Sequence, residues 1–201
     1  SFETGDGAGY TVYLGSSPQY GSAHFRLDGQ SETYLTSDLS TFDVNATVST
    51  WIDPSYPTAA QEEVNRMTLE NANGRLEFER EEEDTWTLAD LGEDETLDQA
   101  QVTAIVRRAT SVSMREPLGT EERPSYGMEA PNAVVTLETE EKTVTLRVGA
   151  RSSDEAGHVV KSSESDYYVV VADTSVSALV ENGRDAFLKA PPTPEGESSG
   201  S

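Results

Sequence analysis

The sequence predicts an α+β fold with antiparallel or mixed sheets, a few helices and two tandem related units, of which the first is incomplete. Two observations lead to this prediction. Short segments alternate apolar and polar residues between Gly- and Asn-rich turns, which is typical of strands with one buried face. An internal repeat also links the two ends of the chain. Three residues recur 134 positions later without a gap, so that Gly15 matches Gly149, His24 matches His158 and Tyr34 matches Tyr168.

The first copy is represented by its C-terminal part, residues 1–58. Its apolar alternation predicts strands over 11–15, 24–27 and 32–35, with a Gly/Ser-rich turn after the first of them. Residues 38–51 fill the place of the helix that follows the third strand in the second copy. They offer four core residues: Phe42, Val44, Val48 and Trp51.

The second copy is complete and spans residues 62–189. Its leading half predicts strands over 64–69, 75–80 and 85–88, with a turn at 71–74. Thr96 and Gln99 match a capping box with Thr96 at the N-cap, so we expect a helix to begin there. Its buried face should hold Val102, Ile105, Val106 and Ala109.

The trailing half of the second copy begins with Met114 to Pro117, which lead into a polar loop that ends at 126–131. Strands are expected over 133–138, 144–148, 158–161 and 167–171, the last of them apolar enough to be buried on both faces. Asp173, Thr174 and Ser175 offer N-cap side chains for a final helix. Its stripe would contain Val176, Leu179, Val180, Ala186 and Phe187. Residues 190–201, rich in Pro, Gly and Ser, are expected to be a disordered tail.

The charge balance excludes several functional classes. The chain has 37 acidic and 14 basic residues in 201, for a net charge of −23, and 35% of its residues are hydrophobic. Such a chain repels nucleic acid and anionic lipid headgroups. The sequence contains no run of about 18 apolar residues, so we expect no direct membrane insertion. Cysteine is absent, which excludes disulfides and thiolate sites. The scattered acids indicate a halophilic adaptation, a surface kept hydrated in concentrated salt; a cation-binding surface is the alternative.

No group of residues stands out as a catalytic constellation, and no cofactor is expected. His24 and His158 occupy the same repeat position, which favours a structural role, with a composite metal site as the alternative. Residues 90–98 lack the ligand spacing of an EF-hand loop. Asn45 lies in an N-glycosylation sequon. Four tyrosines are expected to alternate along exposed strands: Tyr10, Tyr13, Tyr20 and Tyr34. The functional alternative is that they form an aromatic face that contacts a sugar.

The order of these segments resembles the "domain of unknown function 4340" (DUF4340) family. The resemblance rests on an edge hairpin over 74–80, a Trp after it, a Tyr-Gly-hydrophobic-x-x-Pro segment and the strands at 144–149 and 167–171. The residues that carry the family motif, to which we assign a structural role, are Trp86, Tyr126, Gly127, Pro131, Gly149 and Tyr168. The resemblance implies an envelope protein with an N-terminal membrane anchor and tandem domains outside the membrane. Some members occur beside ABC-transporter components of the gliding-motility type. On this basis the anchor and the leading half of the first copy are expected to lie outside this chain.

These observations lead us to expect a non-catalytic extracytoplasmic domain, secreted or anchored in its precursor, that serves protein–protein interaction or scaffolding at the cell envelope. Its partners would be envelope proteins, transporter-associated or gliding-type assemblies included, with self-association as a further mode. One alternative is a subunit of an extracellular filament or surface layer, joined through strand edges or termini. A second alternative is a hydrolase or carbohydrate-binding protein, which would require a deep pocket with two buried carboxylates or a bound sugar.

Overall fold

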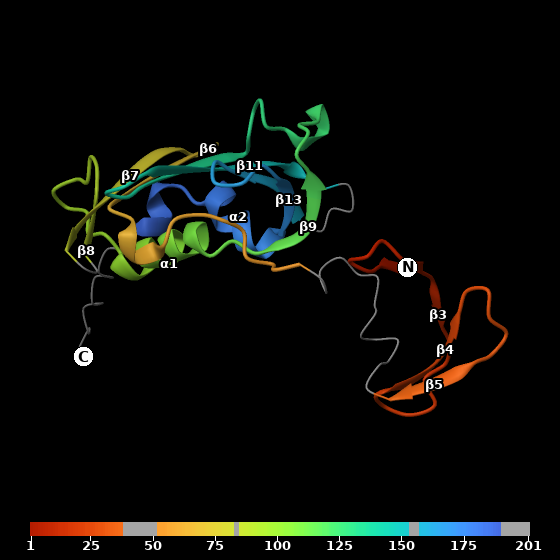
Figure 1. Cartoon of the computed structure of the whole chain (residues 1–201). Coiled ribbons are helices and arrows are strands. Elements are labelled where there is room, and N and C mark those ends of the chain that lie inside the picture. Colours follow the sequence, from red (N-terminus) through yellow and green to blue (C-terminus); the bar gives the residue numbers. More distant parts are fainter. Residues whose placement is uncertain (38–51, 83–84, 153–156, 190–201) are drawn as a thin grey trace, which may run out of the picture. The chain divides into compact units, whose positions relative to one another are not determined.

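The computed structural model describes residues 1–37, 52–82, 85–152 and 157–189, which form two compact units, Ser1–Ile52 and Asp53–Ser201 (Figure 1). Every strand pair in the described residues is antiparallel, and two α-helices accompany the strands. The α+β class predicted from the sequence is therefore confirmed. None of the described helices combines the length and apolar content of a membrane-spanning segment.

The first unit contains two small sheets. β1 (Phe2–Glu3) pairs with β2 (Gly9–Tyr10), and β3 (Val12–Leu14), β4 (Ser22–Leu27) and β5 (Tyr34–Ser37) form a three-stranded meander. Leu14, Phe25 and Tyr34 are cross-strand neighbours, and the rings of the last two stack with centroids 5.3 Å apart. The expected core residues Phe42, Val44, Val48 and Trp51, together with the sequon at Asn45, lie outside the described residues.

The second unit is built on an eight-stranded sheet. Its strands are β6 (Arg66–Asn71), β7 (Gly74–Glu82), β8 (Thr85–Leu88), β9 (Met114–Gly119), β10 (Ala133–Glu138), β11 (Thr143–Arg151), β12 (Gly157–Ser162) and β13 (Tyr168–Ala172). Their order across the sheet is β8-β7-β6-β10-β11-β12-β13-β9. The chain thus runs to one edge, crosses over through a helix to the opposite edge at β9, and returns to the middle at β10.

Both helices cover one face of this sheet: α1 (Gln99–Thr110) and α2 (Asp173–Glu181), with the 3-10 turns η2 (Gln61–Glu63) and η4 (Arg184–Phe187) beside them (Figure 1). The buried face of α1 contains the four residues predicted for it: Val102, Ile105, Val106 and Ala109. α2 buries Val176 and Leu179 but ends at Glu181. The expected stripe is therefore wrong at its end, where Ala186 is exposed and Phe187 is buried from η4. The Phe187 ring packs edge-on against Phe78, with centroids 5.0 Å apart.

The expected capping box at the start of α1 is wrong. The N-cap is Asp98, whose carboxylate accepts hydrogen bonds from the amides of Ala100 (3.0 Å) and Gln101 (3.3 Å). Gln99 instead reaches the edge strand β8. The Trp86 amide donates to Gln99 Oε1 (2.9 Å), and Gln99 Nε2 donates to the Trp86 carbonyl (2.8 Å). The glutamine side chain takes the place that a neighbouring strand would have at this edge.

The opposite edge strand, β9, was not predicted as a strand; Met114 to Pro117 were expected to lead into a polar loop. Its sequence contains Pro117, which lacks an amide hydrogen and is tolerated in sheets mainly at edges. The beginning of β9 is covered, because the Met114 amide donates to the Pro54 carbonyl (2.7 Å) and the Tyr56 amide donates to the Val112 carbonyl (2.9 Å). Both edges of the large sheet are therefore partly occupied by segments of the same unit.

The internal repeat corresponds to the same strand meander in each unit, β3-β4-β5 in the first and β11-β12-β13 in the second. The pairing register is not identical. An offset of 134 carries the pair Val12–Leu27 onto Leu146–Lys161, whereas Leu146 is paired with Ser162. A register shift between Val148 and Arg151 in β11 accompanies the difference.

Candidate functional site

The sheet face opposite the helices is partly covered by the segment 120–132, called here the 120–132 loop, which connects β9 to β10. At its centre is the 3-10 turn η3 (Pro124–Tyr126). Tyr126 and Met128 are buried against Val159 and Tyr168, and the two tyrosine rings lie with centroids 5.3 Å apart. This small cluster anchors the loop on β12 and β13, separately from the main core.

Two glycines allow the loop to lie directly on the sheet. Gly127 ends η3 with φ = +69°, in the left-handed region that favours glycine. A Cβ at Gly149 would lie 2.1 Å from the Tyr126 carbonyl oxygen and 2.9 Å from Met128 Cε. Asn132 holds the end of the loop, because its Nδ2 donates to the Gly149 carbonyl (2.8 Å).

The structure therefore brings together four of the six motif residues chosen from the sequence, namely Tyr126, Gly127, Gly149 and Tyr168, and Pro131 lies in the same loop. Trp86 lies elsewhere, buried on the helix side of the sheet. The Arg80 guanidinium stands over the Trp86 ring, 4.8 Å from its centroid, and donates to the Gln61 (2.8 Å) and Glu62 (2.9 Å) carbonyls. Trp86 thus has a packing role.

Beside the loop, the same face is hollowed by a cavity of about 380 Å³, called here the trench. Its apolar lining comes from Leu118, Tyr126, Val159 and Val170. Its polar lining comes from Glu116, Arg123, Ser125, Arg151 and Ser152. The lining residues belong to β9, the 120–132 loop and the β11–β12 region, with Val170 from β13. The trench therefore crosses this part of the sheet, and the 120–132 loop forms one of its walls.

The charge of the trench differs from that of the chain as a whole. Two arginines and one glutamate line it, in a protein with a net charge of −23. Arg123 is exposed, and its guanidinium lies 5.9 Å from the Tyr126 ring centroid. Arg151 is about half exposed and has one terminal nitrogen 3.0 Å from Asp173 Oδ1. None of these polar residues was selected from the sequence; the one available signal was that Arg123 precedes the Pro-Ser-Tyr-Gly segment.

The two repeat-related histidines have different surroundings. His24 is half-buried in the first unit, with Nδ1 3.2 Å from the Ser16 hydroxyl. His158 is 4% exposed, and its Nδ1 lies 3.4 Å from Asp173 Oδ1 without a hydrogen bond. Burial, assisted by the positive charge of Arg151, lowers the pKa of His158, while Asp173 acts in the opposite direction. No cluster of three or more His, Asp or Glu suited to a metal ion occurs in the described residues.

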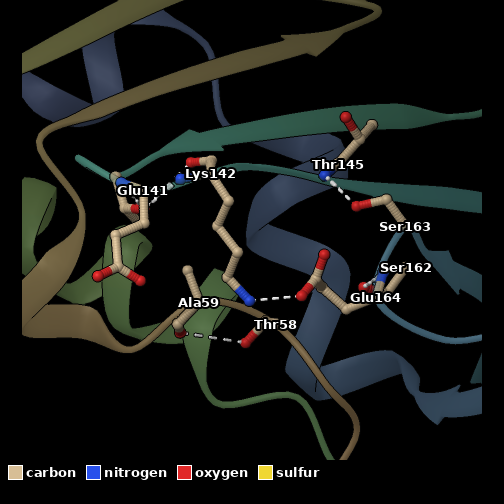
Figure 2. Close-up of polar contacts among 9 residues, drawn as sticks. Thr58, Ala59, Glu141, Lys142, Thr145, Ser162, Ser163 and Glu164 are labelled. Carbon is tan, nitrogen blue, oxygen red and sulfur yellow. Dashed lines mark hydrogen bonds and ion pairs between the residues drawn. The ribbon is translucent and has the colours of Figure 1, made fainter.

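Many of the acids on the open face of the large sheet are paired. Arg66 contacts Glu79 (3.3 Å) and Glu138 (3.8 Å) on the two neighbouring strands, and Arg75 contacts Glu70 and Glu77. Figure 2 shows a second polar cluster at the start of β11, where Lys142 pairs with Glu164 and the Thr145 amide donates to Ser163 Oγ (3.0 Å). Glu62, Glu63, Glu140 and Glu141 line a separate open hollow of about 290 Å³.

The tyrosines of the first unit do not form one aromatic face. Tyr13 lies opposite Arg26, whose guanidinium is 5.3 Å from the Tyr13 ring centroid. Tyr34 pairs with Phe25, the residue before Arg26. Because successive residues of a strand point to opposite faces, Tyr13 and Tyr34 lie on opposite sides of this sheet.

Comparison with known proteins gives one kind of match. A family model described as "Domain of unknown function (DUF4340)" matches residues 2–96 and, as a second copy, residues 86–191. The two matches confirm that the chain holds two tandem copies. They do not follow the expected bounds of 1–58 and 62–189, because they overlap over 86–96, from within β8 to just before α1. No curated protein matches the chain, and no solved structure does.

Proposed function

The chain belongs to the DUF4340 family, and from this premise we propose that it is a non-catalytic interaction or scaffold domain of a cell-envelope protein, acting outside the cytoplasm on a protein partner. One observation carries the proposal: the trench beside the 120–132 loop. It is concave, has an apolar floor and carries two arginines on a strongly acidic protein. Apolar floors with a few placed polar groups are typical of binding sites.

The construction of the trench supports a binding role. Its loop wall is fixed by the buried Tyr126–Tyr168 contact and by the close approach of Gly149. A wall held in this way needs little reordering when a partner arrives, which reduces the entropic cost of association. We therefore assign four of the six motif residues, Tyr126, Gly127, Gly149 and Tyr168, to the support of the trench.

The alternative of a filament joined through strand edges is less well supported. At the β8 edge, the Gln99 side chain is hydrogen-bonded to the backbone amide and carbonyl of Trp86. At the β9 edge, the segment around Pro54 and Tyr56 is hydrogen-bonded to the backbone at the start of the strand. A partner strand would have to displace these contacts before pairing. The hydrolase alternative requires two carboxylates in a pocket, and Glu116 is the one carboxylate in the described lining of the trench.

In-cell photo-cross-linking tests the proposal. A photo-reactive amino acid replaces Ser125 at the trench wall, and a matched control replaces Ser111, an exposed serine at the end of α1. Position 125 should yield one discrete cross-linked partner that mass spectrometry identifies as an envelope protein, and position 111 should not. Equal cross-linking from both positions, or no partner from position 125, would contradict the proposed function.

A further inference from the structure

The lining of the trench indicates what kind of group it binds. Arg123 and Arg151 each carry a planar guanidinium, which matches a carboxylate with two parallel hydrogen bonds. Arg123 has no ion-pair partner among the described residues, and its contact with the Tyr126 ring leaves its N–H groups available. On a chain of net charge −23, an anion is repelled over most of the surface. The trench is a local exception because of Arg123, since the charge of Arg151 is already paired with Asp173 at 3.0 Å.

The other residues that line the trench restrict the charge of the anion and the kind of group next to it. Glu116 lies in the same trench, and its negative charge disfavours a dianionic phosphate compared with a singly charged carboxylate. Glu116 also offers an acceptor for an N–H group of the ligand. Leu118, Val159 and Val170 supply an apolar floor, so the carboxylate should adjoin an apolar group.

The size of the trench also limits its occupant. About 380 Å³ is close to the lower end of the range of roughly 300–1,000 Å³ that small ligands occupy, too little for a folded partner but enough for the end of a chain. A carboxylate, an adjacent N–H and an apolar side chain occur together at the C-terminus of a polypeptide, and capture of that terminus is a known mode of recognition.

We propose that the trench binds the C-terminal residues of an extended partner segment, with Arg123 holding the terminal carboxylate and the apolar floor holding an adjacent side chain. This inference rests on the proposed interaction function and gives it a ligand class. Arg151, whose guanidinium is paired with Asp173, adds positive charge to the lining of the trench.

Isothermal titration calorimetry on the full chain tests this inference, at a KCl concentration that keeps the protein folded. The probes are N-acetyl-Ala-Val-Leu with a free carboxyl group, the same peptide as its amide, and decanoate. The free acid should bind at least tenfold more tightly than the amide, because the amide lacks the charge that the Arg123 guanidinium pairs with. Decanoate, which has the carboxylate and an apolar chain but no N–H, should bind more weakly than the free acid.

Variants locate the binding. Arg123→Gln should weaken binding of the free acid about tenfold, Arg123→Lys should recover part of the loss, and the matched control Arg107→Gln on α1 should have no effect. Equal affinity for acid and amide, unchanged affinity after Arg123→Gln, or tighter binding of decanoate would overturn the inference. If these results came together with a specific cross-link from position 125, the proposed function would stand and the ligand class alone would fall.

Discussion

Gly149→Ala tests whether the 120–132 loop owes its position to the absence of a side chain at one residue of β11. The added Cβ would lie 2.1 Å from the Tyr126 carbonyl oxygen, whereas ordinary contacts begin near 3.4 Å. The loop would have to retreat by about 1.3 Å, the difference between these two distances. Tyr126 is held by its buried contact with Tyr168, so this retreat disturbs the cluster that anchors the loop.

The expected cost follows from the kind of atom that is displaced. Overpacking in a well-packed interior typically costs about 1–3 kcal/mol, and a backbone contact cannot be relieved by a change of rotamer, so we expect about 2–3 kcal/mol of lost stability. For a chain of this length that corresponds to a fall in melting temperature of about 5–10 °C. Urea denaturation followed by circular dichroism gives the free energy, and hydrogen exchange should show faster exchange at the amides of 124–132.

The repeat supplies a matched control. Gly15 occupies the position equivalent to Gly149, but a Cβ there would meet its nearest atom, His24 Cβ, at 3.7 Å. Gly15→Ala should therefore be neutral or stabilising by about 0.4–1 kcal/mol, because it reduces the freedom of the unfolded chain. If Gly149→Ala were as stable as the unsubstituted protein, with unchanged exchange in the loop, the account of the close approach would be wrong.

Four further predictions follow from other contacts. Gln99→Leu should cost about 2 kcal/mol for two lost hydrogen bonds at the β8 edge and should promote aggregation, measured by denaturation and light scattering; a variant as stable and monodisperse as the parent would contradict this role. Asp98→Ala should lower the free energy of unfolding by about 1 kcal/mol through loss of the N-cap, while Thr96→Ala should leave it unchanged. A larger loss from Thr96→Ala than from Asp98→Ala would instead support Thr96 as the N-cap. Because the pKa of His158 is lowered in the folded state, stability should fall as pH drops through about 6.5, and His158→Gln should remove that part of the slope; identical pH profiles would refute it. The melting temperature should rise with KCl concentration, since salt screens the repulsion within a chain of net charge −23; equal stability in dilute and molar KCl would refute the proposed salt adaptation.

The parts of the fold that could be predicted are those in which one short segment carries its own signal. The helix α1 was recognisable from the spacing of Val102, Ile105, Val106 and Ala109, and β7 from the alternation of polar and apolar residues over 75–80. β9 could not be recognised, because an edge strand has one neighbour and tolerates Pro117, so its sequence resembles a loop. The N-cap of α1 was misplaced because Gln99, which completes the capping box in the sequence, bonds to a strand 13 residues earlier.

The candidate site shows the same division. The motif residues Tyr126, Gly127, Gly149 and Tyr168 could be selected from the sequence and do lie together. The trench beside them could not be selected, because its lining comes from β9, the 120–132 loop, β11, β12 and β13, whose proximity is set by the order of strands in the sheet. Nothing in the sequence distinguishes Arg123 and Arg151 from other surface arginines, and only the order of strands places them in the lining of one trench.

The central claim is that the trench is the surface on which this domain meets its partner. The most direct measurement is the amide chemical-shift map of the isotope-labelled protein titrated with N-acetyl-Ala-Val-Leu free acid. The account predicts that the largest changes fall on Leu118, Ser125, Tyr126, Val159 and Val170, with little change along β8 or in the first unit. Changes centred on β8 or on the first unit, or no changes at saturating peptide, would contradict it.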